Sequence, residues 1–102
     1  MPNPLLKGLR PVHPGELLRE DVLPALGRTK AEIARLLGIS RQTLYDILNE
    51  RQPVTPAMAH RLAKLLGGSR EAWLNMQRNC DLAAAERELA DALAAIPTLK
   101  AA

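Results

Sequence analysis

The stretch TKAEIARLLGISRQTLYDILN, residues 29–49, decides the fold of this chain. Apolar residues recur at helical spacing on both sides of Gly38, which predicts two short helices joined by a tight turn. Gly38 ends the first helix because a residue without a Cβ adopts a left-handed backbone at the lowest cost. The hydroxyl of Ser40 caps the next helix. The pattern predicts a helix-turn-helix whose second helix, residues 41–49, enters the major groove of DNA.

The composition of the chain favours helices over strands. It holds 19 Leu and 16 Ala against 11 Val, Ile and Thr together, and no Phe. With 102 residues, we expect one all-α domain of five to six helices with a C-terminal helical extension. The expected parts are an N-terminal arm over residues 1–13, the helix-turn-helix DNA-binding domain over residues 14–81, and an Ala-rich helix and tail over residues 82–102.

Caps and stops mark the limits of the individual helices. A first helix is expected from residue 14 to residue 22 or 26, with Pro24 able to kink or end it. Thr29 and Glu32 form a capping box before the helix over residues 30–37. The other expected starts are Thr55 with Pro56 for a fourth helix, Ser69 for a fifth after Gly67 and Gly68, and Leu82 for a last, Ala-rich helix that Pro97 ends.

Positive charge is concentrated on the helix-turn-helix and its neighbour. The whole chain carries a net charge of +3. Residues 28–64 carry a net +4, whereas residues 1–27 carry 0 and residues 65–102 carry −1. Binding to the phosphates of nucleic acid requires this placement of charge.

The exposed face of the helix over residues 41–49 offers side chains that can read bases. Arg41 can bind guanine O6 and N7 as a fork, and Gln42 can bind adenine N6 and N7 in the same way. Tyr45 shares that face, and Asp46 is expected to orient an arginine or to read cytosine because it would repel phosphate. Thr43 suits a thymine methyl group or a phosphate. The expected backbone-phosphate contacts are Thr29 and Lys30 at the start of the helix over residues 30–37, and Asn49, Arg51 and Gln52 beyond the helix over residues 41–49.

The parts needed for catalysis, metal binding or membrane insertion are missing from the sequence. His13 and His60 lie in different elements, and Cys80 has no histidine near it in sequence. No Cys/His spacing suits a metal, so we expect no enzyme, no metal, no cofactor and no small-molecule substrate. One cysteine cannot form an intramolecular disulfide, and no apolar run approaches the roughly 18 residues that cross a bilayer. Without a signal-peptide core, a cytoplasmic protein is expected.

The C-terminal third has two interpretations. Trp73 is either a packing anchor or a contact for a partner, since aromatic residues are frequent at interfaces. Leu82, Leu89, Leu93 and Ile96 recur at near-heptad spacing. The helix that carries them either packs on a partner or covers the core of its own domain, because so short a helix is marginal in water alone.

Two long segments of the chain resemble the HigA-type antitoxins of bacterial toxin–antitoxin modules, within the Cro and phage-repressor-like (lambda-repressor-like) helix-turn-helix class. They are VHPGELLREDVLPALG, residues 12–27, and TKAEIARLLGISRQTLYDILNERQPVTPAMAHRLAKLLGGSREAWLNMQ, residues 29–77. The resemblance extends over about residues 12–85. Its most specific motifs are His13-Pro14-Gly15-Glu16, Arg41-Gln42-Thr43-Leu44 and Trp73-Leu74-Asn75.

The resemblance implies a homodimer that binds a palindromic operator in double-stranded DNA and represses its own operon. It also implies neutralisation of a HigB toxin, a RelE-like ribonuclease that cleaves mRNA on the ribosome. Carried onto this chain, the DNA surface consists of Thr29, Lys30, Ser40, Arg41, Gln42, Thr43, Tyr45, Asn49 and Arg51. The implied dimer contacts are Trp73, Met76, Leu82, Leu89 and Leu93.

The toxin surface is left open between the N-terminal arm with the first helix and the C-terminal helices. Many antitoxins of other families carry a long acidic tail, whereas this chain has a short, mildly acidic helical one, which disfavours wrapping of a toxin active site. Two other functions compete with an antitoxin. A stand-alone repressor would lack a small ribonuclease-like reading frame upstream, and an interaction module without DNA binding would give no salt-dependent mobility shift.

Overall fold

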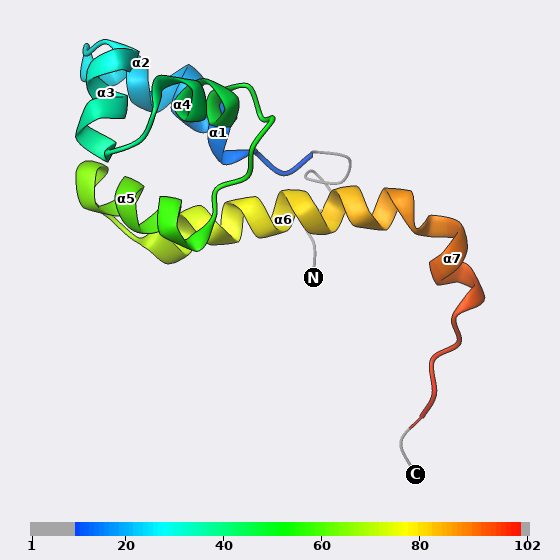
Figure 1. The fold of residues 1–102 in the computed structure, drawn as a ribbon. Helices are drawn as coiled ribbons and strands as arrows, with labels where there is room; N and C mark the ends of the chain where they lie inside the picture. Colours follow the sequence, from blue (N-terminus) through cyan, green and yellow to red (C-terminus); the bar gives the residue numbers. More distant parts are fainter. Residues whose placement is uncertain (1–9, 101–102) are drawn as a thin grey trace.

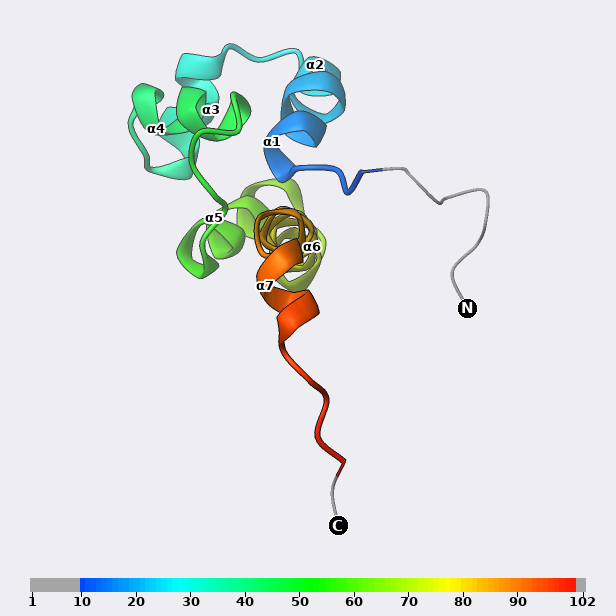
Figure 2. The same cartoon turned by 90° about the vertical axis from the view of Figure 1, so that its right-hand side faces the viewer.

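The computed structural model describes residues 10–100, and this part of the chain is helical without strands. Helices α1 to α5 form a compact body, and α6 starts beneath it and projects far beyond it (Figures 1 and 2). The long projection makes the molecule 55 Å long and 28 by 24 Å across. The elements are α1 (Pro14–Leu17), a π-helical turn η2 (Leu18–Val22), α2 (Leu23–Leu26), α3 (Lys30–Leu37), α4 (Arg41–Leu48), α5 (Pro56–Leu66), α6 (Arg70–Glu88) and α7 (Ala90–Ala95).

The first three elements form one helical run from Pro14 to Leu26. The amide of Leu23 donates to the carbonyl of Leu18, five residues back, which defines a widened turn. Pro24 follows this turn and has no N–H to donate. The helical run therefore continues past Pro24 and ends at Gly27, whose φ of 65° is left-handed.

One core joins the helix-turn-helix to its neighbours. The predicted inner faces of α3 and α4 are confirmed. Their six residues are all buried: Ile33, Ala34 and Leu37 on α3, and Leu44, Ile47 and Leu48 on α4. Trp73 is only 8% exposed and belongs to the same cluster, which supports its interpretation as a packing anchor. The buried residues are Leu18, Leu23, Ile33, Ala34, Leu37, Leu44, Ile47, Leu48, Val54, Met58, Ala59, Leu62 and Trp73.

The expectation of a separate helix starting at Leu82 is wrong. Helix α6 continues through this position to Glu88, because no Gly or Pro interrupts it and Ala is the strongest helix former. The helix breaks instead at Leu89, after which α7 begins. The stop at Pro97 is confirmed: Ile96 is extended, as expected for a residue before proline. The domain limit between residues 81 and 82 stays a prediction.

The ends of the chain differ in their contacts with the body. Residues 1–9 of the predicted arm lie outside the described residues, and residues 10–13 lead into α1 without forming a helix. The thiol of Cys80 donates to the carbonyl of Pro11 over 3.5 Å, so this segment rests on α6. No helix between residues 10 and 100 combines the length and the apolar character needed to cross a bilayer.

Candidate nucleic-acid interface

The turn between α3 and α4 is closed by a pair of backbone hydrogen bonds. Gly38 has a φ of 73°, and its N–H donates to the carbonyl of Arg35 over 3.1 Å. The N–H of Ile39 donates to the carbonyl of Ala34 over 3.0 Å. These two bonds form a Schellman motif, which satisfies the last carbonyls of α3 and turns the chain sharply into α4.

Hydroxyl groups cap the starts of both helices. The Thr29 hydroxyl accepts from the N–H of Glu32 over 3.1 Å, and the Ser40 hydroxyl accepts from the N–H of Thr43 over 3.0 Å. The Glu32 carboxylate accepts instead from Arg28, so only one half of the predicted capping box forms. The Ser40 hydroxyl also donates to Thr43 Oγ1 over 2.8 Å, which ties two predicted DNA contacts into the cap.

The outer face of α4 is continuous with the start of α3. Arg41, Gln42, Tyr45 and Asn49 are exposed there, as the sequence predicts. The ammonium group of Lys30 lies 5.7 Å from the centre of the Tyr45 ring, within the range of a cation–π contact. The structure therefore brings the predicted base readers and a predicted phosphate contact onto one surface.

The carboxylate of Asp46 accepts a hydrogen bond from a glutamine on the same helix. The Gln42 amide nitrogen donates to Asp46 Oδ1 over 2.9 Å, one helical turn away. The expectation that Asp46 orients an arginine is therefore wrong, because Gln42 at i−4 lies on the same helix face and reaches the carboxylate first. Asp46 itself is half-buried, whereas Gln42 is exposed.

The loop after α4 is held from two sides. The carbonyl of Asp46 accepts from the N–H of Arg51 over 2.8 Å and from that of Gln52 over 3.2 Å. Further along, the N–H of Val54 donates to the buried side chain of Gln77 over 2.9 Å. Gln77 was missed by sequence reasoning. Its signal was its place four residues after Trp73, on the inward face of α6.

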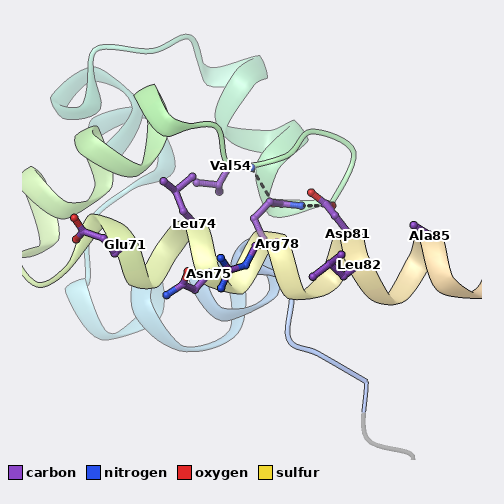
Figure 3. A pocket seen from close by; sticks show the side chains of 9 residues that line it. Val54, Glu71, Leu74, Asn75, Arg78, Asp81, Leu82 and Ala85 are labelled. Carbon is purple, nitrogen blue, oxygen red and sulfur yellow. Dashed lines mark hydrogen bonds between the residues drawn. The ribbon is translucent and has the colours of Figure 1, made fainter. Parts of the chain in front are cut away.

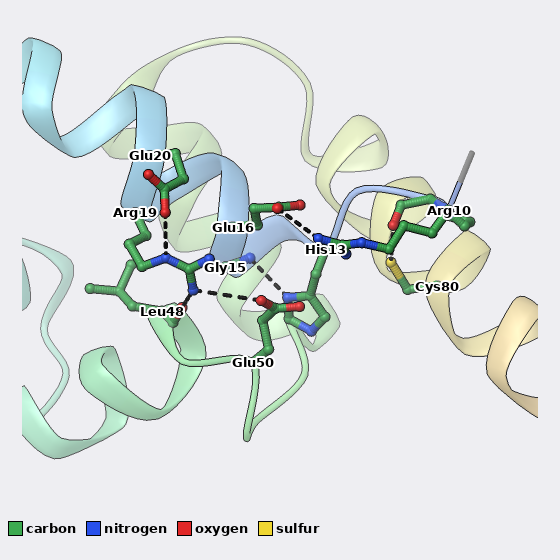
Figure 4. Close-up of polar contacts among 10 residues, drawn as sticks. Arg10, His13, Gly15, Glu16, Arg19, Glu20, Leu48, Glu50 and Cys80 are labelled. Carbon is green, nitrogen blue, oxygen red and sulfur yellow. Dashed lines mark hydrogen bonds and ion pairs between the residues drawn. The ribbon is translucent and has the colours of Figure 1, made fainter. Parts of the chain in front are cut away.

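Two arginines donate hydrogen bonds to the C-terminal ends of the two helices of the helix-turn-helix. Arg61 on α5 donates to the carbonyl of Leu37, the last residue of α3, over 2.7 Å. Arg19 on η2 donates to the carbonyl of Leu48, the last residue of α4, and its guanidinium contacts Glu20 and Glu50 (Figure 4). The hydrogen bond to Glu20 raises the pKa of Arg19. Sequence reasoning assigned neither arginine this role, since nothing local indicates so distant an acceptor.

The residues of the His13-Pro14-Gly15-Glu16 motif have structural roles at the start of α1. His13 Nδ1 accepts from the N–H of Gly15 over 2.9 Å and caps α1 (Figure 4). A Cβ on Gly15 would lie 1.9 Å from the carbonyl oxygen of Ile47, so only glycine permits α1 to approach the end of α4. Glu16 pairs with Arg10 over 2.8 Å.

The predicted dimer contacts divide into buried and exposed residues. Trp73 is buried and Met76 is half-buried, whereas Leu82, Leu89 and Leu93 are exposed by 62%, 48% and 47%. A hollow of about 630 Å³ runs along α6 (Figure 3). Its lining combines apolar side chains with charges of both signs, from Val54, Glu71, Leu74, Asn75, Gln77, Arg78, Asp81, Leu82 and Ala85.

The remaining candidates for reactive chemistry are the possible metal ligands and the Cys80 thiol. Between residues 10 and 100, no three His, Cys, Asp or Glu side chains are grouped so that they could hold a metal ion. Burial raises the pKa of the Cys80 thiol, which disfavours the reactive thiolate. The sequence interpretation of Cys80 as a small, partly buried residue agrees with its half-buried position.

The fold and its exposed recognition helix define a helix-turn-helix protein of the DNA-binding class. The helix-turn-helix family matches residues 18–74. Antitoxin HigA-1 of Vibrio cholerae is 37% identical over 73 residues, which cover 72% of this chain and 69% of that protein. The chain belongs to the helix-turn-helix family and, within it, to the HigA-type antitoxins.

Solved structures agree with this assignment. Antitoxin GraA in complex with its operator is 39% identical, with a TM-score of 0.83 and 99% of each chain covered. The Pseudomonas aeruginosa antitoxin HigA with the higBA promoter is 34% identical, with a TM-score of 0.83 over 89% of this chain and 100% of that one. The all-α fold and the family resemblance are thus confirmed. This family comprises DNA-binding regulators and antitoxins and is not known for enzymes.

Proposed function

We propose that this chain is an antitoxin that binds operator DNA as a homodimer, represses its own operon and neutralises a HigB-type, RelE-like mRNA-cleaving toxin. The observation that carries the proposal is the preformed outer face of α4, with Arg41, Gln42 and Tyr45 exposed beside Lys30. The chain acts by binding in the cytoplasm, without catalysis, metal, cofactor or small-molecule substrate.

Eight of the nine DNA-surface residues that the resemblance implies have a specific role in this proposal. Arg41 and Gln42 read base edges in the major groove. The N-terminus of α3, with Thr29 and Lys30, meets a backbone phosphate. Asn49 and Arg51 contact the backbone beyond α4, while Ser40 and Thr43 support the helix start from which Arg41 projects.

A second copy of the chain covers the exposed face of α6 and α7. Leu82, Leu89 and Leu93 supply the apolar contact, and Met76 adds its exposed part. Trp73 contributes by packing α6 onto the body rather than by contact. In such a dimer, the two α4 helices lie about 34–36 Å apart and enter successive major grooves. Repression follows because the bound dimer blocks RNA polymerase at the operator.

DNA binding is tested by mobility shifts at several salt concentrations. The probe is the DNA directly upstream of the gene that encodes this chain. Arg41→Ala should weaken specific binding roughly tenfold and relax one base position. Lys30→Ala should weaken binding to all sequences alike and lower the salt slope by about 1. Arg70→Ala is the matched control, because Arg70 is exposed at the start of α6, away from α4. Unchanged operator affinity in Arg41→Ala would contradict the assigned surface.

The toxin partner is tested by co-expressing a tagged chain with the adjacent small reading frame. Co-purification, together with rescue of growth from the toxicity of that frame, is the expected result. The N-terminal segment with α1 and the C-terminal helices are the two surfaces to map. Absence of both toxicity and binding would leave a stand-alone repressor.

Dimerisation is tested by sedimentation equilibrium. Leu82→Glu and Leu89→Glu should shift the chain toward monomer, because they place charge in the apolar contact. Leu99→Glu is the control, since Leu99 is 86% exposed and lies beyond α7. Dimers of undiminished stability in both the Leu82 and the Leu89 variant would place the interface elsewhere.

A further inference from the structure

One pair of side chains on α4 is joined before any DNA arrives. The Gln42 amide nitrogen donates to Asp46 Oδ1 over 2.9 Å. We propose that Asp46 is a positioning residue that fixes the Gln42 amide so that it reads adenine in preference to guanine. This inference rests on the operator binding proposed above and assigns the specificity of one base position.

The chemistry of the pair decides which way the amide faces. An ionised carboxylate only accepts hydrogen bonds, so the nitrogen end of the Gln42 amide must face Asp46. The reverse orientation would place two acceptor oxygens together. The amide therefore keeps its Oε1 acceptor and its second N–H free for a ligand.

This free pair of atoms matches one base edge in the major groove. Adenine offers the N6 amino donor beside the N7 acceptor, which suits one acceptor and one donor on Gln42. Guanine offers two acceptors, O6 and N7. Gln42 has only one N–H left for them, and the nearby Asp46 carboxylate adds repulsion between acceptors. Adenine is therefore favoured.

The loop after α4 holds the backbone from which the Asp46 carboxylate projects. The backbone carbonyl of Asp46 accepts from the amides of Arg51 and Gln52, and the next residue, Ile47, is buried. Arg41 makes no side-chain hydrogen bond or ion pair with any residue between 10 and 100. Of Arg41 and Gln42, the two residues that can make bidentate base contacts, only Gln42 is therefore preorganised. Preorganisation lowers the conformational entropy lost on binding DNA.

The test is selection of preferred sequences from randomised DNA duplexes by the full chain. Binding is then measured to the four base variants at each selected position. Wild type should prefer adenine over guanine at one position of each half-site by roughly tenfold or more. Gln42→Ala should abolish this preference and leave the other positions unchanged.

Two substitutions of Asp46 separate its positioning role from a structural one. Asp46→Ala should reduce the adenine preference to about threefold or less at the same position, as expected when a bidentate contact loses its orientation. Affinity for the other sequences should not fall, because a negative charge near phosphate is removed. Asp46→Asn should retain most of the preference, since its side-chain oxygen still accepts from Gln42. Gln42→Ala/Asp46→Ala should behave as Gln42→Ala alone.

Three results would overturn the inference while leaving operator binding intact. They are a guanine preference at the Gln42 position, an unchanged pattern in Asp46→Ala, and a uniform loss at every position in both Asp46 variants. Thermal melting of each variant identifies misfolding, and Asp46→Asn then provides the decisive comparison. Wild type that selects no sequence at low salt would refute operator binding itself, and this inference with it.

Discussion

The helix-turn-helix and the C-terminal arm of α6 and α7 both carry leucines on their helices but differ in how far they bury them. In α3 and α4, Ile33 and Leu44 are each only 2% exposed. In the arm, Leu82 and Leu93 are exposed by 62% and 47%. The first region completes its packing within one chain, whereas the second leaves apolar side chains exposed.

The ends of the helices show the same contrast. Helices α3 and α4 start at hydroxyl caps and end at carbonyls that Arg61 and Arg19 reach from neighbouring helices. Helix α7 starts without a side-chain cap. Because an uncapped start leaves backbone groups to water, α7 depends on packing for its order more than the capped helices α3, α4 and α6 do.

The largest expected effect comes from truncating one leucine in each region. Leu44→Ala should lower the free energy of unfolding by about 3 kcal/mol, because it removes buried methyl groups and leaves a cavity. Leu82→Ala should change the free energy of unfolding of the monomer by less than about 0.5 kcal/mol, as for other exposed sites. Urea denaturation at low protein concentration measures both. Equal losses would show that the arm packs within its own chain.

A smaller effect is expected where the N-terminal segment meets the end of α4. Gly15→Ala should cost about 2 kcal/mol of stability, because its Cβ would overlap the carbonyl of Ile47. Gly27→Ala is the matched control: its Cβ would meet nothing within 4 Å, so only the left-handed backbone costs about 1 kcal/mol. Thermal melting compares the two. A smaller loss in Gly15→Ala than in Gly27→Ala would argue against this close approach.

Matched caps separate stability from DNA binding. Ser40 caps α4 and Ser69 caps α6, with hydrogen bonds of 3.0 and 3.1 Å to the amides of Thr43 and Ala72. Replacing either serine by Ala should cost about 1 kcal/mol of stability. Only Ser40→Ala should also weaken operator binding, because the first turn of α4 carries Arg41. Mobility shifts decide, and equal DNA affinity in the two variants would contradict this role.

The smallest effect is a dependence on pH at the start of α6. Hydrogen bonds lower the pKa of the Glu71 carboxyl below its ordinary value of 4.5. The main one comes from the backbone N–H of Glu71 itself, and the next comes from the Ser69 hydroxyl. The contribution of Glu71 to stability is therefore fully present above pH 4.5 and is lost as pH falls through the lower folded pKa. Glu71→Gln should reduce the dependence of the melting temperature on pH in this range. An identical slope in wild type and variant would disprove the contribution.

Local residues predicted the helix-turn-helix because its signals act over short distances. Gly38 as a stop and Ser40 as a cap each act within one turn of the chain, so their roles were readable without a fold. The sequence prediction of a new helix at Leu82 is wrong, because α6 includes the Ala-rich segment. Ala 83–85 continue a helix as readily as they start one, and no residue there forces an end.

Contacts between distant residues required the folded chain. Arg19 and Leu48 lie 29 residues apart, and Val54 and Gln77 lie 23 apart. Each donor had several acceptors of equal chemistry available in sequence. Only the packing of η2 on α4, and of the loop on α6, selects one of them.

The sequence by itself determined the family, the helix-turn-helix and its outer polar face, because capping, helical periodicity and charge are local properties. Tertiary structure alone decided that Gly15 must be glycine, that Trp73 is buried, and that the arm leaves Leu82 exposed. These outcomes depend on which surfaces of distant segments come within van der Waals contact. Burial is a property of the assembled fold and is not carried by any single stretch of residues.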